Sequence, residues 1–320
     1  MGVTRLGLQI PSFTYSGVAD RDLFRHVASI AHAAEGSGFD SVWVMDHYYQ
    51  IPQIGPRTEP MLEAYTLLGA LAASTETVSL GTMVTGVTYR NPALLAKQVT
   101  TLDTISSGRA VLGIGAAWNE DEHAGYGFEF PPIGERLNRL EEALQICRAM
   151  FTERAPSFAG RYYSIHEALN FPRPIRSQGI PILVGGGGEK RTLKLVAQYA
   201  DACNLFGDVD TVRHKLSVLG RHCEDVGRDP AEITKTKLGT LVIAETAERA
   251  RAKLDDVARA RGLHPDQLGA FVIAGDPDSV AEQVVDYLEV GLDGRIFNMP
   301  DAQDLEPVRL AGETLARVFA

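Results

Sequence analysis

Short β-rich apolar runs alternate with longer amphipathic runs along the whole chain. The β-rich runs predict eight strands, at Leu6–Ile10, Ser41–Met45, Val78–Val84, Arg109–Ile114, Pro181–Val184, Asp201–Leu205, Lys237–Ala244 and Arg295–Asn298. The amphipathic runs predict helices at Arg21–Gly36, Ala64–Ser74, Pro92–Thr104, Glu135–Phe151, Lys190–Tyr199, Thr211–Val226, Ala247–Arg261, Asp278–Val290 and Leu305–Phe319. This alternation is typical of βα units around a parallel sheet.

Eight such units in 320 residues fit a (β/α)8 barrel, the TIM barrel, better than an open doubly wound sheet. About 250 residues suffice for the barrel, and loop insertions account for the rest. The main insertions are expected between the fourth and fifth strands, at Ala116–Gly134 and Arg154–Gly179, with another around His264–Phe271. We therefore expect one α/β domain over residues 1–320.

The composition excludes several classes of protein. Hydrophobic residues make up 45% and charged residues 22%, as in an ordinary globular chain. The net charge is −10 and no basic block is present, so nucleic acid is not an expected partner. The chain shows neither a run of about 18 apolar residues nor the layout of a signal peptide, so no membrane partner and a cytoplasmic location are expected.

Two ionisable residues follow the second predicted strand, at the end of the barrel where active sites lie. Asp46 and His47 stand there, next to Tyr48 and Tyr49. A carboxylate in this place can accept hydrogen bonds from a heterocycle, and an imidazole can pass a proton near neutral pH. The alternative is that Asp46 caps a turn and His47 is an ordinary rim residue.

Four consecutive glycines follow the fifth predicted strand. Gly185, Gly186, Gly187 and Gly188 allow backbone amides to approach a ligand closely, and a helix is predicted to begin at Lys190. A helix N-terminus favours an anion, so the run indicates a phosphate site. The alternative is a plain flexible turn, and the run matches neither the dinucleotide-binding nor the Walker motif.

The fourth strand ends in small residues that leave space for a flat ligand. Gly113 and Gly115 supply this space, and Asn119 or Glu120 can reach back over it. The acidic residues from Glu120 to Glu122, with His123, lack an established metal-ligand spacing. We expect them to begin a short solvated helix, and we expect no metal site.

Several segments carry a family resemblance, in order along nearly the whole chain. They are Val44-Met45-Asp46-His47-Tyr48-Tyr49-Gln50, Leu80-Gly81-Thr82-Met83-Val84-Thr85 with Tyr89-Arg90-Asn91-Pro92-Ala93, Ser107-Gly108-Arg109 leading into Gly113-Ile114-Gly115, Phe158-x-Gly160-Arg161-Tyr162-Tyr163, and Pro181-Ile182-Leu183-Val184 with its glycines. The chain resembles the bacterial luciferase-like flavin and deazaflavin oxidoreductases. It is most similar to the members that use coenzyme F420.

The resemblance implies a (β/α)8 barrel, usually dimeric, that binds a tricyclic ring at the strand ends and its phosphate at the glycine-rich loop. The implied cofactor-binding residues are Asp46, Met83, Val84, Thr85, Gly115, Asn119, Gly185, Gly186, Gly187 and Gly188. His47 is the implied catalytic proton donor. The resemblance also implies a cis peptide bond between Met83 and Val84, behind the ring. We expect a homodimer that acts on a small-molecule substrate.

The implied reaction is hydride transfer between F420 and an unidentified organic substrate. Four cations near strand ends can accompany the oligoglutamate tail of F420, namely Lys190, Arg191, Arg57 and Arg90. One alternative is a two-component monooxygenase that uses flavin mononucleotide (FMN). Another is a flavin- or deazaflavin-binding protein without turnover.

The chain departs from the family at one place that bears on the substrate. The sugar-phosphate dehydrogenase branch carries a carboxylate base directly after the fourth strand, where this chain has Ala116, Ala117 and Trp118. We therefore expect a different substrate. An aromatic set suggests that it is apolar or planar, namely Phe13, Tyr15, Tyr48, Tyr49, Trp118 and Tyr126.

Overall fold

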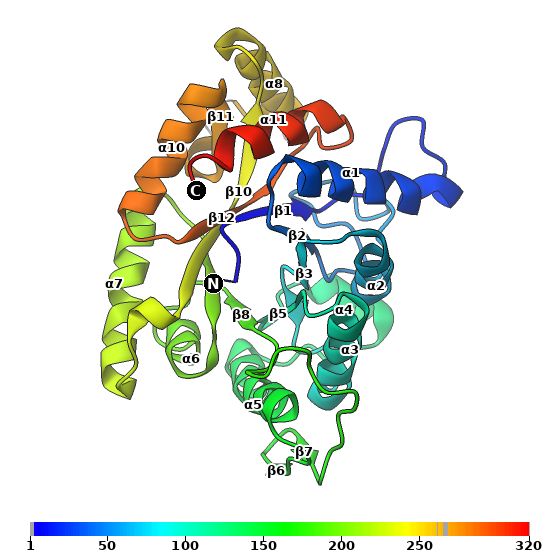
Figure 1. Ribbon diagram of the computed structural model, residues 1–320, viewed down its shortest axis with the longest axis vertical. Helices are drawn as coiled ribbons and strands as arrows, with labels where there is room; N and C mark the ends of the chain where they lie inside the picture. Colours follow the sequence, from blue (N-terminus) through cyan, green and yellow to red (C-terminus); the bar gives the residue numbers. More distant parts are fainter. Residues whose placement is uncertain (1–2, 261, 265–267, 320) are drawn as a thin grey trace.

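Eight parallel strands close into a barrel in the computed structural model, which describes residues 3–260, 262–264 and 268–319. The strands are β1 (Leu6–Ile10), β2 (Ser41–Val44), β3 (Ser79–Thr82), β5 (Ala110–Gly115), β8 (Ile182–Gly185), β9 (Ala202–Leu205), β10 (Thr234–Ile243) and β12 (Gly294–Asn298). Each pairs with the next in this order, and β12 pairs with β1 to close the ring. The predicted (β/α)8 barrel is confirmed, and Figure 1 shows the helices arranged around the strands.

The helices match the predicted set, with shifted ends. They are α1 (Leu23–Ser37), α2 (Ala64–Ser74), α3 (Pro92–Ile105), α5 (Ile133–Thr152), α6 (Thr192–Tyr199), α7 (Val209–Val226), α8 (Ala247–Ala260), α10 (Pro277–Glu289) and α11 (Leu305–Leu315). Short 3-10 turns occur at Asp20–Asp22, Pro230–Glu232 and Gly269–Phe271. Residue 261, the predicted end of α8, and residues 265–267 of the predicted insertion lie outside the described residues.

The two predicted insertions between β5 and β8 carry small elements of their own. The first holds the helix α4 (Glu120–Tyr126), and the second holds an antiparallel pair, β6 (Phe158–Ala159) and β7 (Ser164–Ile165). The strand β11 (Val272–Gly275) was not predicted. It pairs only with the last four residues of the long strand β10.

The third predicted strand is interrupted. The sequence pattern predicts one strand over Val78–Val84, whereas the structure has β3, a break, and β4 (Thr85–Gly86). The peptide bond between Met83 and Val84 is cis and lies in this break, as the family resemblance implied. Both β3 and β4 pair with β5, so the interruption stays within the barrel wall.

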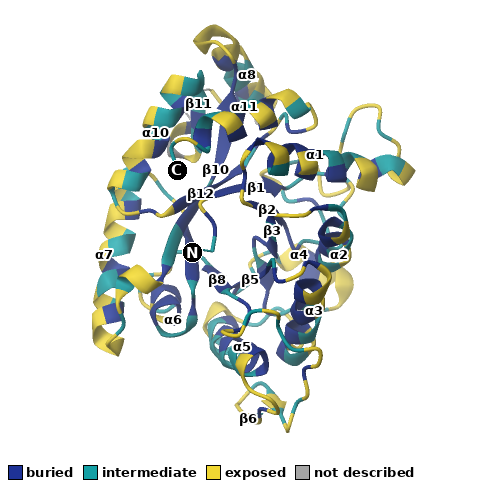
Figure 2. Ribbon diagram, viewed as in Figure 1, coloured by how far each residue is buried: buried dark blue, intermediate teal, exposed yellow. Residues whose placement is uncertain are grey.

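Buried side chains fill the space between sheet and helices and also the inside of the barrel, as the dark strands in Figure 2 indicate. The interior cluster consists of Trp43, Met83, Val111, Leu183, Ala202 and Ile296. Trp43 is fully buried, and its indole N–H donates a hydrogen bond to Ser41 Oγ at 2.8 Å. The barrel is therefore a packed core rather than a pore, so a ligand site must lie at its rim.

No helix within the described ranges is long and apolar enough to cross a membrane. The expected homodimer and the expected cytoplasmic location stay predictions.

The close approach of β3 and β5 gives a test of the barrel wall. A Cβ added at Gly113 would overlap the carbonyl oxygen of Thr82. We expect Gly113→Ala to lower the free energy of unfolding by about 3 kcal/mol, because backbone cannot move aside as a flexible side chain can. In the control Gly69→Ala, in α2, the new Cβ meets nothing within 4 Å. Urea unfolding measures the free energy of unfolding of both variants. A Gly113→Ala protein as stable as the wild type would contradict this packing of β3 against β5.

Candidate active site

A cavity of about 950 Å³ opens at the carboxyl ends of the barrel strands. His47, Met83, Trp118, Phe206 and Asn298 line it, each at or just after the end of a different strand. Most of the other walls are apolar, and they include Met45, Ile51, Pro52, Ile54, Pro56, Leu238, Leu263, Leu268 and Phe271. A cavity of this size and character is typical of sites for organic ligands.

His47 lies between this cavity and a buried carboxylate. Its Nδ1 is 2.8 Å from Glu122 Oε2, and its ring meets the edge of Trp118 with 5.4 Å between centroids. The His47 side chain is 14% exposed, whereas that of Glu122 is 0% exposed. The second ring nitrogen, Nε2, makes no hydrogen bond with any described residue. Since His47 lines the cavity, Nε2 is the ring nitrogen that remains available to a ligand there.

Glu122 accepts hydrogen bonds from three further donors. The backbone N–H groups of Tyr48 and Tyr49 reach Oε1 at 2.5 and 2.9 Å, and the Tyr89 hydroxyl reaches Oε2 at 2.7 Å. Burial alone would raise the pKa of Glu122, but the hydrogen bond and charge of His47 and the other donors outweigh it, so the pKa is lowered. Glu122 is therefore a carboxylate near neutral pH.

This arrangement corrects the expectation of a solvated acidic helix. Glu122 and His123 are both fully buried in α4, and only their neighbours face solvent. The sequence shows a run of charges, and only the packing of α4 against the loop after β2 distinguishes the buried acid from the exposed ones. Among the described residues, no three His, Cys, Asp or Glu side chains lie close enough to hold a metal ion.

Asp46 is bound by an arginine behind the cavity wall. Arg90 Nη1 and Nη2 donate to the two carboxylate oxygens of Asp46 at 2.7 and 3.0 Å, and Nη2 also donates to Glu63 at 2.6 Å. Burial lowers the pKa of Arg90, but the Asp46 carboxylate outweighs it and raises the pKa, so the guanidinium stays charged. The Arg90 side chain is 8% exposed, so it is not available to a cofactor tail. Contact between Asp46 and the cofactor stays a prediction.

The predicted residues of the interrupted strand divide between the cavity and the wall. Met83 lines the cavity, whereas Val84 packs against Gly115 and Gly185. A Cβ added to either glycine would lie 2.9 Å from a methyl group of Val84. Thr85 is buried, and its hydroxyl is 2.7 Å from the hydroxyl of Tyr65. Gly115 and Gly185 thus provide space for Val84.

The three glycines from 186 to 188, which we call the glycine turn, connect β8 to a hydrogen-bonded turn at residues 189–191. Helix α6 then begins at Thr192 rather than at Lys190. Gly186 has a φ of +118°, and a Cβ at Gly187 would meet only Lys215, at 3.7 Å. Lys215, in α7, donates to Glu189 at 2.6 Å. Lys215 was not predicted as a site residue, because a lysine in the middle of a helical run carries no local sign of a site.

The other predicted cations lie in different places. Arg191 turns toward α5 and donates to Asn138 Oδ1 at 2.7 Å, while Lys190 is exposed. Arg57 lines the cavity and stacks on the ring of Tyr49, 4.6 Å from its centroid. Asn119 stands just before α4, and its carbonyl oxygen is 2.7 Å from His123 Nδ1.

The predicted aromatic pocket is wrong for most of its members. Trp118 lines the large cavity, whereas Phe13 belongs to the hydrophobic core. Tyr48, Tyr49 and Tyr126 pack against one another and against Tyr89 and Phe128. These rings gather over the buried carboxylate of Glu122, so they form a support for the site and not a wall of the cavity.

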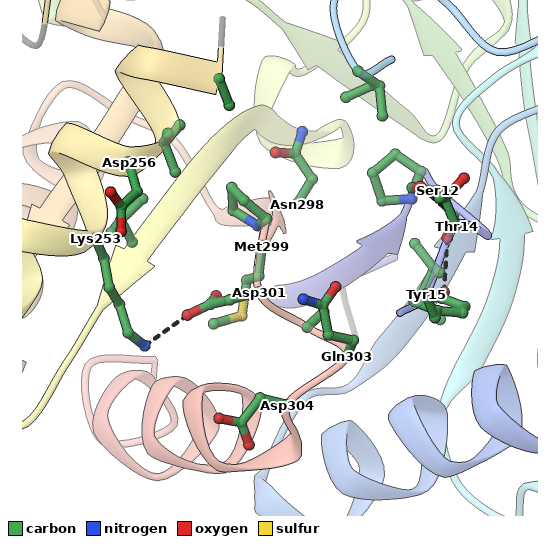
Figure 3. Close-up of a pocket in the computed structure, with 18 of the residues that line it drawn as sticks. Ser12, Thr14, Tyr15, Lys253, Asp256, Asn298, Met299, Asp301, Gln303 and Asp304 are labelled. Atoms are coloured by element: carbon green, nitrogen blue, oxygen red, sulfur yellow. Dashed lines mark hydrogen bonds and ion pairs between the residues drawn. The ribbon is translucent and has the colours of Figure 1, made fainter. Parts of the chain in front are cut away.

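A second cavity of about 580 Å³ adjoins the first. The two cavities share the lining residues Gln53, Ile54, Ala260 and Asn298. Figure 3 shows Lys253 of α8 on one side and Ser12, Thr14 and Tyr15 on the other, with the segment after β12 between them. An ion pair of 2.6 Å joins Lys253 to Asp301 of that segment. Tyr15 also lines this cavity, and its hydroxyl donates to the backbone oxygen of Ser12. Two adjoining cavities at one rim can hold two molecules side by side.

Comparisons with known proteins agree with this architecture. An F420-dependent glucose-6-phosphate dehydrogenase from Kineococcus radiotolerans is 30% identical over 311 residues, which cover 89% of this chain and 90% of the relative. The solved structure of the coenzyme F420 dependent tetrahydromethanopterin reductase from Methanopyrus kandleri superposes with a TM-score of 0.81, at 19% identity, over 99% of both chains. An F420-dependent secondary alcohol dehydrogenase in complex with an F420-acetone adduct also gives a TM-score of 0.81, at 21% identity, over 100% of both chains.

The two solved structures show the shared barrel fold. The sequence model of one family, described as luciferase-like monooxygenase, matches residues 5–264 of this chain. The match extends from the first barrel strand past α8, and so includes His47, Glu122 and the glycine turn. The chain belongs to the luciferase-like monooxygenase family.

Proposed function

We propose that this protein is a coenzyme F420-dependent oxidoreductase that transfers a hydride between the deazaflavin and a small organic substrate. The observation that carries the proposal is the placement of His47, which lines the 950 Å³ cavity, holds a buried carboxylate at Nδ1 and leaves Nε2 available to a ligand. The relative that is named an F420-dependent dehydrogenase supports the choice of cofactor. When bound, F420 supplies a ring that accepts or releases two electrons as a hydride.

The residues at the rim fit such a cofactor. The apolar walls of the large cavity suit a flat ring, and Met83 and Trp118 supply polarizable surface for it. The turn at 186–188 stands before the N-terminus of α6, and Gly187 leaves open space beside Lys215. Backbone amides, a helix N-terminus and an ammonium group together suit a phosphate.

His47 moves the proton in this proposal. In the oxidation of an alcohol, the neutral imidazole accepts the hydroxyl proton at Nε2, and in the reverse reaction the imidazolium donates a proton from the same atom. Trp118 contacts the edge of this imidazole, and most of the other walls of the cavity are apolar. Glu122 compensates the charge of the imidazolium at the opposite ring nitrogen.

We infer that the substrate is an uncharged organic molecule with an apolar body. The cavity that His47 lines has walls that include Phe206, Leu238 and Phe271. Directly after β5 the chain has Ala116 and Ala117, where the sugar-phosphate branch has a carboxylate base. The adjoining second cavity provides space for the part of the substrate that does not react.

Separate fluorescence titrations with F420 and with FMN test the cofactor. We expect F420 to bind at micromolar or lower concentration and more tightly than FMN, because Lys215 and the glycine turn can accompany an anionic chain. Tighter binding of FMN, with oxygen uptake when reduced FMN is supplied, would identify a monooxygenase instead. Tight F420 binding without hydride exchange with any alcohol or ketone would indicate a binding protein.

A substitution at His47 tests the proton transfer. We expect His47→Ala to lower kcat by about 100-fold or more and to leave F420 affinity within about twofold, because the imidazole acts on the substrate and not on cofactor binding. His166→Ala, at an exposed position in the second insertion, is the matched control. Stopped-flow reduction of F420 by an alcohol that the wild type oxidises gives both values. Full turnover by His47→Ala would exclude the proposed role.

A pair of substitutions tests the phosphate site. We expect Gly187→Val and Lys215→Ala each to weaken F420 binding by about tenfold, the first by filling the space beside Lys215 and the second by removing a cation. Arg213→Ala changes an exposed cation of the same helix and serves as the control for net charge. Equal F420 affinity in all four proteins, the wild type included, would show that the phosphate binds elsewhere.

A further inference from the structure

Glu122 does more than neutralise a charge, because its two oxygens face different kinds of donor. Oε1 accepts from the backbone N–H groups of Tyr48 and Tyr49, which belong to the loop after β2. Oε2 accepts from the side chains of His47 and Tyr89. The backbone donors cannot change their chemistry, so Oε1 must always be an acceptor.

The donors on Oε2 follow from the charge of Glu122. A carboxylate can only accept hydrogen bonds, and the two backbone N–H groups and the Tyr89 hydroxyl favour the ionised form of Glu122 even when His47 is neutral. Burial and the neighbouring Glu122 raise the pKa of the Tyr89 hydroxyl, so this group keeps its proton and donates it. His47 Nδ1 must therefore carry a hydrogen, and in the neutral imidazole the lone pair must lie on Nε2, toward the cavity.

We propose that Glu122 is a positioning residue that fixes neutral His47 in the Nδ1–H tautomer and thereby makes Nε2 the atom that accepts the substrate proton. The inference rests on the proposed function for the proton transfer, but the tautomer itself is a property of the protein without any ligand. The two hydrogen bonds from backbone N–H groups to Oε1 fix the orientation of the Glu122 carboxylate. The tautomer of His47 therefore does not depend on a mobile side chain.

The substitution Glu122→Gln should invert this arrangement. The carbonyl oxygen of glutamine takes the place of Oε1, because only an acceptor can face the two backbone N–H groups. Its amide nitrogen then takes the place of Oε2 and donates to His47 Nδ1. The imidazole responds by carrying its hydrogen on Nε2, and the lone pair no longer faces the cavity.

Nitrogen NMR of protein labelled with ¹⁵N-histidine measures the tautomer directly. The pair of ring-nitrogen signals that disappears in His47→Ala is assigned to His47. We expect the neutral Nδ1–H form in the wild type and the Nε2–H form in Glu122→Gln. We also expect kcat for alcohol oxidation to fall by about 100-fold or more in Glu122→Gln, with F420 affinity within about twofold. Tyr89→Phe removes one donor from the same oxygen and keeps the carboxylate, so it should retain the wild-type tautomer.

An Nε2–H tautomer of neutral His47 in the wild type would overturn the inference, even if Glu122→Gln does not fold. An unchanged tautomer or full turnover in Glu122→Gln would also overturn it and leave Glu122 a structural residue. Failure of F420 to bind the wild type would instead overturn the proposed function. In that case the NMR result on the ligand-free protein would still decide the role of Glu122.

Discussion

The site depends on one constraint, which is that the buried charge of Glu122 must be surrounded by hydrogen-bond donors. An ionised carboxylate without such partners is too costly to bury. The donors come from the loop after β2 and from Tyr89 in the segment between β4 and α3, while Glu122 itself comes from α4 in the first insertion. Satisfying one charge therefore brings three separate segments to one place on the barrel rim. The orientation of His47 follows from that assembly.

A second buried pair reinforces the first. Asp46 adjoins His47 in the chain, and Arg90 adjoins Tyr89, so the ion pair of Asp46 with Arg90 joins the same two segments that Glu122 joins. These two sets of contacts restrict the backbone of both segments beside the cavity. Below it, Trp43 and the other interior side chains close the barrel, so that the cavity has a rigid floor. A proton-transfer group on such a support keeps its direction without help from a ligand.

The regular parts of the fold and the candidate site differ in how far the sequence predicts them. All eight barrel strands were predicted, because each is a short apolar run separated from the next by a helical period. Strand β11 was missed, and the third strand was predicted as continuous, because a break of two residues does not change the hydrophobic pattern. His47 was singled out from its position after a strand. Glu122 was taken for a solvated acid, since burial of one member of a charged run depends on distant partners.

Three features could be read from the amino-acid sequence without any coordinates, namely the alternation of strands and helices, the family resemblance, and the end of the barrel at which a site is expected. These depend on local periodicity and on chain order, both of which can be read without knowing what lies beside what. Three other features became visible only in the folded chain: Arg90 is enclosed by Asp46 and Glu63, Lys215 lies beside Gly187, and Glu122 holds His47. The reason is physical: the state of a charged side chain is set by its partners and its access to water, and both come from segments far away in the chain.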